Sequence, residues 1–212
     1  MGAAACRNSF SAADKKITPT NFQLEIIQLG DFRRNEVIRD LMLLLMQRIG
    51  TRLDIQKITK ELGVSRPALA EYISFLEGTY FIKTINPFSQ GKDTEIRKMP
   101  KVYLCDTGIA KHFAKLDIGR LFENSIFQNL RLNGEVNYYQ RKSGTEIDFI
   151  LNKKFAYEVK LKPQESEAKK LKKLAGDLNL EGYKIVSKNY FESENIIYGF
   201  QIYIQQKTFG ES

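Results

Sequence analysis

Two runs of alternating apolar and polar residues, separated by only three residues, constrain this chain more than any other feature. The runs cover residues 145–151 and 155–161. Because side chains along a β-strand point to its two faces in turn, each run predicts a strand. The short connection centred on Lys153 predicts that the two strands form an antiparallel hairpin.

This hairpin brings acidic residues together. Residues equidistant from Lys153 should face each other, so Asp148 is expected across from Glu158, and Glu146 across from Lys160. Directly opposed side chains have Cβ atoms about 4.5–5.5 Å apart, and like charges at that distance are destabilising. Such a carboxylate pair favours a shared proton or a divalent cation, and Mg²⁺ suits a site built from oxygen atoms.

The alternation also assigns each side chain to a face. On the first strand, Asp148 is expected on the face opposite to Ile147 and Phe149. On the second strand, Glu158 and Lys160 are expected on one face. Lys160 could then orient a water molecule or stabilise charge that develops on a phosphate.

A third carboxylate comes from the helix predicted over residues 119–133. Glu123 shares a helix face with Ile126, Phe127 and Leu130 by its spacing. A charge on an apolar face is expensive to bury without a partner. Glu123 is therefore predicted to join Asp148 and Glu158 as a metal ligand.

The second half of the chain has the element order α-β-β-β-α-β with one extra strand. A short helix capped by Asp106 precedes it and should end near Ala114. The fold class expected is α/β with a mixed sheet, and the predicted elements are the helix 119–133, the strands 136–140, 145–151 and 155–161, the helix 165–178, and the strands 183–186 and 200–204.

The first half predicts three helices followed by two strands, which is typical of a winged helix. Asp54 and Ser65 are expected to cap the second and third helices, and Gly63 to end the second. The third helix exposes one base and more acids, which suits DNA poorly. Docking to another protein domain is therefore an equal alternative for this half. The predicted elements are helices 36–49, 55–62 and 66–76, and strands 80–85 and 102–104.

Glu123, Asp148 and the sequence Glu158-Val159-Lys160 together resemble the PD-(D/E)xK nuclease pattern, particularly its Holliday-junction-resolvase-like branch. The proline that often precedes the first strand acid is missing here. The resemblance implies a restriction-endonuclease-like domain in which the acids hold Mg²⁺ and Lys160 assists hydrolysis of a phosphodiester.

Residues 35–162 also resemble the C-terminal region of bacterial and archaeal AAA-type ATPases, in which a winged helix precedes such a nuclease-like domain. The resemblance implies an ATPase domain or subunit as partner, and a chain that is either a fragment or a family member without its ATPase domain. It rests on Leu76-Glu77, Pro100-Lys101-Val102-Tyr103, Asp106-Thr107-Gly108, Leu121-Phe122-Glu123-Asn124, Glu146-Ile147-Asp148-Phe149 and Glu158-Val159-Lys160.

The charge of the chain favours DNA as a partner. Its net charge is +8 and its pI about 9.3, and residues 153–173 hold eight lysines and three acids. A basic surface of this kind binds polyanions, although a solvated helix face is the alternative for lysines of the helix 165–178. The predicted DNA contacts are Lys153, Lys154, Lys162, Lys169, Lys170 and Lys173.

Several classes of protein are excluded. No apolar run approaches the roughly 20 residues of a membrane span. His112 is the only candidate for a histidine-centred triad, and no Gly-x-Ser-x-Gly nucleophile elbow accompanies it. One histidine and two cysteines do not build a usual structural zinc site. No phosphate-binding loop for ATP is present. The cysteine content indicates a reducing, cytoplasmic setting.

The chain is thus expected to have a flexible tail at 1–20, a winged-helix domain at 21–112 and a nuclease-like domain at 113–212. The first hypothesis is a Mg²⁺-dependent DNA endonuclease, a hydrolase of phosphodiesters. The alternative is a non-catalytic DNA- or protein-binding regulatory module from the C-terminal half of an AAA-type ATPase. In that alternative, Lys160 and Lys162 simply neutralise the acids.

Overall fold

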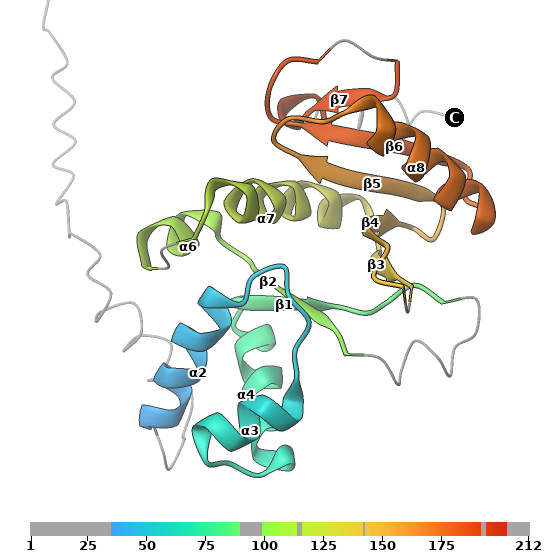
Figure 1. The fold of residues 1–212 in the computed structure, drawn as a ribbon. Coiled ribbons are helices and arrows are strands. Elements are labelled where there is room, and N and C mark those ends of the chain that lie inside the picture. Colours follow the sequence, from blue (N-terminus) through green and yellow to red (C-terminus); the bar gives the residue numbers. More distant parts are fainter. Residues whose placement is uncertain (1–34, 90–98, 114–115, 142, 192–193, 203–212) are drawn as a thin grey trace, which may run out of the picture.

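The computed structural model describes residues 35–89, 99–113, 116–141, 143–191 and 194–202 (Figure 1). The tail predicted for residues 1–20 lies outside these ranges. The chain is a mixed α/β protein with a helical N-terminal region and a mixed five-stranded sheet. In the described part, no helix is both long and apolar enough to cross a membrane.

In the ranges described, the N-terminal region has three helices and a two-stranded antiparallel sheet, in the predicted order. Side-chain caps begin two of the helices: Asp54 accepts a hydrogen bond from Lys57 N, and Ser65 accepts one from Ala68 N. Gly63 ends the second helix with a φ of 62°, as predicted. The elements are α2 (Asn35–Gln47), α3 (Ile55–Leu62), α4 (Arg66–Gly78), β1 (Ile82–Ile85) and β2 (Lys101–Leu104).

The five strands of the larger sheet are arranged in sequence order. The first three are antiparallel neighbours, and the last three run parallel. They are β3 (Val136–Gln140), β4 (Glu146–Leu151), β5 (Phe155–Lys160), β6 (Gly182–Ser187) and β7 (Ile196–Tyr198). The accompanying helices are α6 (Thr107–Phe113), α7 (Ile118–Leu130), its continuation η1 (Arg131–Asn133), α8 (Glu165–Asp177) and η2 (Gly199–Gln201).

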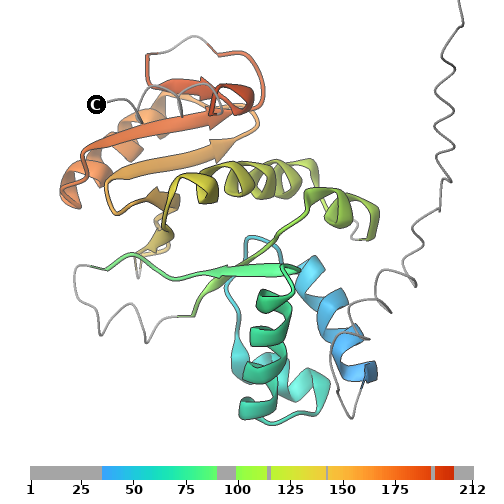
Figure 2. The same cartoon turned by 180° about the vertical axis from the view of Figure 1, so that it is seen from behind.

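Two helices cover opposite faces of this sheet. Helix α7 lies between the sheet and the N-terminal region, whereas α8 covers the outer face (Figures 1 and 2). One apolar core runs without interruption from α2 through Phe127 of α7 to Phe149 of β4. A second, smaller core contains Ile150 and lies under Leu171 of α8. A side chain on the buried face of α7 therefore lies between the N-terminal region and the sheet.

The last strand departs from the prediction for residues 200–204. Phe200 belongs to η2, and the strand is β7, which ends at Tyr198. The chain turns here because Tyr198 N donates a hydrogen bond to Gln201 Oε1 at 2.8 Å. Residues 203 and 204 lie outside the described part.

A β-bulge interrupts β4 at Asp148 and Phe149. The pairing of β3 with β4 shifts there, so that these two residues lie opposite Tyr138 alone. As a result, Ile147 lies in the second core and Phe149 in the first. The prediction that Ile147 and Phe149 share a face is therefore wrong, because an extra residue shifts the alternation.

Candidate functional site

The β4–β5 hairpin has the predicted register. Its pairs run from Leu151–Phe155 to Phe149–Tyr157, with Lys153 at the centre. Backbone pairing stops at the Phe149–Tyr157 level. Asp148, Glu158 and Lys160, the residues predicted to form the metal site, lie just beyond that level.

At that level, the carboxylate of Asp148 replaces a backbone acceptor of the ladder. Asp148 Oδ2 accepts a hydrogen bond from Val159 N at 2.8 Å. Besides burial, the charge of the nearby Asp148 helps to raise the pKa of the Glu158 carboxyl group. Asp148 is only 7% exposed. Asp148 and Glu158 thus lie together, as the register predicts, at the point where the two strands separate.

Lys160 contacts one of these acids directly. Its Nζ lies 2.8 Å from Glu158 Oε1 and 4.0 Å from Glu167 Oε1 of α8. Glu146 was expected across from Lys160, and this expectation is wrong. Its carboxylate lies 3.5 Å from Lys101 Nζ instead, because the β4–β5 ladder ends before this level and the bulge redirects β4.

Lys101 is a member of the site that sequence reasoning missed. Its side chain is only 5% exposed, and its amine lies 5.2 Å from the centre of the Tyr138 ring. Lys101 belongs to the N-terminal region. Backbone hydrogen bonds from Asn86 and Phe88 to Tyr138 join this region to the edge of β3, and they bring Lys101 close to the sheet. The strand predicted from the sequence began at Val102, whereas β2 begins at Lys101 and all four of its residues are buried.

Glu123 lies on the core side of α7, as its spacing predicts. Its Oε1 accepts a hydrogen bond from the Tyr103 hydroxyl at 2.7 Å. A Cβ atom on Gly50 would lie 3.0 Å from the same oxygen. The carboxylate is thus enclosed by the N-terminal region on one side and the sheet on the other.

The electrostatics link Glu123 and Glu158 to Asp148. Burial, and then the charge of Asp148, raise the pKa of Glu123 to about 7, and the same two causes raise the pKa of Glu158 to about 7. Burial also raises the pKa of Asp148, against the opposing charges of Lys101 and Lys160. The cluster therefore holds more negative charge than its surroundings stabilise.

The fit of this cluster to a divalent cation is partial. Glu158 Oε2 is buried without a hydrogen-bond partner. Mg²⁺ commonly takes one or two carboxylates and completes its shell with water and substrate phosphates, so Asp148 and Glu158 suit it. Among the described residues, no three or more His, Cys, Asp and Glu side chains are arranged as a metal site. The role of Glu123 as a third ligand stays a prediction.

The six lysines predicted to contact DNA are all exposed, and their contact with DNA stays a prediction. Lys153 and Lys154 lie at the hairpin, at the far end of β5 from Lys160. Their amines are 3.8 Å from Glu135 and 2.9 Å from Glu181, respectively. The other four, Lys162, Lys169, Lys170 and Lys173, lie after β5 and along α8.

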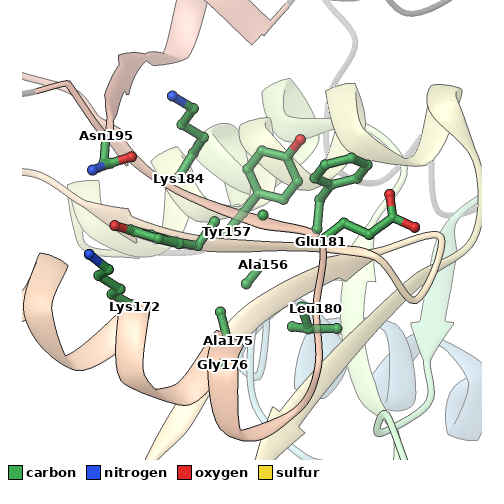
Figure 3. Close-up of a pocket in the computed structure, with 12 residues that line it drawn as sticks. Ala156, Tyr157, Lys172, Ala175, Gly176, Leu180, Glu181, Lys184 and Asn195 are labelled. Atoms are coloured by element: carbon green, nitrogen blue, oxygen red, sulfur yellow. The ribbon is translucent and has the colours of Figure 1, made fainter.

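A cavity of about 470 Å³ lies at the start of β5 and β6. In Figure 3, Tyr157 and Lys184 extend to one side of the sheet, while Ala156 points toward Ala175 of α8. The Lys184 amine already donates to the carbonyl of Glu194 at 3.2 Å. The cavity is not lined by Glu123, Asp148 or Glu158, which we call the acid cluster. We assign the cavity no role.

Comparison with known families places both halves of the chain. The model of a domain of unknown function (DUF8612) matches residues 7–119, more than half of the chain. The chain belongs to the DUF8612 family. A second domain of unknown function (DUF4143) matches residues 118–204. No curated protein and no solved structure matches the chain.

The boundary between the two matches separates the acid cluster from two residues that lie close to it. Lys101 and Tyr103 lie in the DUF8612 part, whereas Glu123, Asp148 and Glu158 lie in the DUF4143 part. Contacts across the boundary, such as the Tyr103–Glu123 hydrogen bond, therefore complete the candidate site.

Proposed function

We propose that the DUF4143 part of this chain is a Mg²⁺-dependent DNA endonuclease-like domain of the PD-(D/E)xK type, and that the DUF8612 part contains a winged helix. One observation carries the proposal. The buried carboxylate of Asp148 and the half-buried carboxylate of Glu158 lie where β4 and β5 separate, and Lys160 lies beside them. The order of α7, three antiparallel strands, α8 and a parallel strand supports it.

Each residue of the cluster has a defined task in this proposal. Asp148 and Glu158 would hold Mg²⁺, with Glu123 near enough to add its charge. When bound, the ion would polarise a phosphoryl oxygen and lower the pKa of a coordinated water. The Lys160 amine, on a side chain that is 32% exposed, would donate hydrogen bonds to the phosphate or to the attacking water.

The proposal is tested by nicking of branched and duplex DNA with and without Mg²⁺. Asp148→Asn and Lys160→Met should each lower the rate on the order of 100-fold or more, because each removes a group that contacts the reacting phosphate or its ion. Asp40→Asn, an exposed acid of α2, is the matched control and should cut at the wild-type rate. Wild-type nicking by Asp148→Asn would contradict the assignment.

Lys101 favours a second candidate, a non-catalytic DNA- or protein-binding module. A buried ammonium group within reach of Glu146, Glu123 and Asp148 supplies positive charge of the kind that an ion would bring. In that case the chain would bind DNA, or an ATPase domain such as the family resemblance implies, with an affinity that Mg²⁺ does not change.

The stability of Asp148 variants also bears on this choice. Asp148→Ala loses the acceptor of the Val159 N–H and should destabilise the fold by about 1–3 kcal/mol under either candidate. Asp148→Asn keeps an acceptor and removes the charge. If the module is non-catalytic, Asp148→Asn should be neutral or stabilising, and should leave DNA affinity unchanged.

A further inference from the structure

Three aromatic side chains form a stack on the surface near the end of β7. The ring centres of Tyr190 and Tyr198 are 6.0 Å apart with an interplanar angle of 14°. The rings of Tyr198 and Phe200 are 5.7 Å apart at 8°. We call these three residues the aromatic stack.

The aromatic stack is open to water at both ends. Tyr190 is 78% exposed and Phe200 is 66% exposed. Exposed rings of this size contribute little to a core, and a row of them marks a surface that binds a partner. Nearly parallel rings with open outer faces can accept further flat rings on either side.

The backbone beneath the aromatic stack is firmly placed. A Cβ atom on Gly199 would lie 2.8 Å from the Phe122 ring, so the chain between Tyr198 and Phe200 lies directly against α7. Tyr198 N also donates to Gln201 Oε1. The backbone that carries Tyr198 and Phe200 is therefore held in place before any partner arrives, which lowers the entropy lost on binding.

The aromatic stack lies at the same end of the sheet as the acid cluster. Lys160 pairs with Ser187, and Ser187 pairs with Tyr198. Registered residues of neighbouring strands point to the same face, and strands are about 4.8 Å apart, so Tyr198 and Lys160 share a face roughly 10 Å apart. The end of β6 continues this edge, since Lys188 N donates to Lys160 O.

Positive charge accompanies the aromatic stack along this edge. Lys162 and Lys188, which follow β5 and β6, are exposed. Lys160 is paired with Glu158 and approaches Glu167. Rings that accept bases, together with lysines that accept phosphates, make up the surface by which proteins bind single-stranded nucleic acid.

We propose that the aromatic stack binds the bases of an unpaired DNA strand and leads that strand across the end of β6 to the acid cluster. The direction of the strand rests on the proposed nuclease function, whereas the binding itself needs neither metal nor cleavage. A DNA substrate would then carry a single-stranded segment next to the bond that is cut. The alternative partner is a protein surface. Substitutions that remove the flat ring but keep an apolar side chain distinguish binding of bases from binding of a protein.

The experiment measures binding of the full chain to a fluorescent oligothymidylate in EDTA, with duplex DNA of equal length for comparison. Tyr190→Leu and Phe200→Leu keep an apolar side chain but remove the flat ring, and each should weaken single-strand binding about fivefold or more. Tyr190→Phe keeps the ring and should bind like the wild type. Tyr80→Leu is the matched control, because Tyr80 is 77% exposed and lies outside the stack.

Each other outcome overturns the proposal. These outcomes are no binding of the oligothymidylate, equal binding by all variants, or a loss in Tyr190→Phe as large as in Tyr190→Leu. The last result would assign the effect to the hydroxyl group rather than to stacking. Ring-dependent binding by a chain that never cuts DNA would refute the nuclease proposal alone. Cutting by a chain whose Leu variants bind normally would refute only the role of the aromatic stack.

Discussion

The two ends of the β4–β5 pair are built from neighbouring residues in different ways. At the hairpin end, backbone hydrogen bonds complete the ladder, and Asn152 and Lys153 adopt positive φ values of 51° and 60° to close the turn. The charges there are exposed. At the other end, the ladder stops. The buried carboxylate of Asp148 accepts a hydrogen bond from Val159 N there, and Glu158 pairs with Lys160.

This difference shows which charged residues the stability of the fold does not explain. Exposed ion pairs at the hairpin end cost little to form and contribute little to stability. Burying charges costs several kcal/mol for each ion before any attraction is counted. Packing accounts for the hairpin end, whereas the acids at the other end are the ones assigned to the proposed cation site.

The largest effect is expected from Gly134→Ala, which breaks the hairpin end. Gly134 has a φ of 142°, and a Cβ atom there would overlap the Asn152 amide, which bonds to Glu135 N and Asn133 O. The free energy of unfolding in urea should fall by about 3 kcal/mol or more. Gly144→Ala, with a φ of 86° and nothing within 4 Å, should cost only about 1 kcal/mol. Equal losses would show that contact with Asn152 does not matter.

Lys101→Met should break the other end almost as strongly. Without the amine, Glu146, Glu123 and Asp148 lose a neighbouring positive charge, and at about pH 8 the free energy of unfolding should fall by roughly 2–4 kcal/mol. The loss should shrink near pH 5, where more of the carboxyl groups are protonated. Lys83→Met on β1, 56% exposed, should change stability by less than about 0.5 kcal/mol. A Lys101→Met chain as stable as the wild type would contradict the charge balance described for the cluster.

The pH dependence of stability sharpens the contrast between the two ends. The pKa values of Glu123 and Glu158 rise from an ordinary 4.5 to about 7 on folding. The folded chain therefore holds protons that the unfolded chain has released, so these groups contribute stability below about pH 5 that is lost as pH rises toward 7.

Glu158→Gln replaces one of these two titrating carboxyl groups by an amide that does not titrate. Measured in EDTA, its free energy of unfolding should fall less than that of the wild type between about pH 5 and pH 8, by up to roughly 3 kcal/mol. Glu181→Gln, on an exposed acid near the hairpin end, should follow the wild-type curve. A Glu158→Gln curve parallel to that of the wild type would mean that Glu158 is ionised normally.

Lys154→Ala should have the smallest effect. Its ion pair with Glu181 is 2.9 Å long, but the two side chains are 57% and 54% exposed. Thermal or urea unfolding should show a loss below about 0.5 kcal/mol, which salt should reduce further. A larger loss would mean that the hairpin end also depends on its charges.

The sequence predicted what depends on local periodicity. The hairpin register followed from strand alternation and a three-residue connection, and the caps at Asp54 and Ser65 from their place before helical patterns. The face of Glu123 followed from its spacing to Ile126 and Phe127. Each of these features is fixed by residues close together in the chain.

The missed features depend on contacts between distant segments. The bulge at Asp148 is set by pairing with β3, and unbroken alternation gives no sign of it. Lys101 reaches Glu146 across 45 positions of sequence. The aromatic stack joins residues from two strand ends, so no periodic pattern marks Tyr190 and Phe200 as neighbours.

Calorimetric titration of Mg²⁺ and Mn²⁺ into the full chain tests the central claim most directly. At about pH 7.5 the wild type should bind a divalent ion at the separated end of β4 and β5, since Asp148 and Glu158 supply oxygen ligands there. Asp148→Asn should lose this binding, and Asp40→Asn should keep it. Equal heats for the wild type and Asp148→Asn would contradict the account, and the acid cluster would then be neutralised by Lys101 and Lys160 alone.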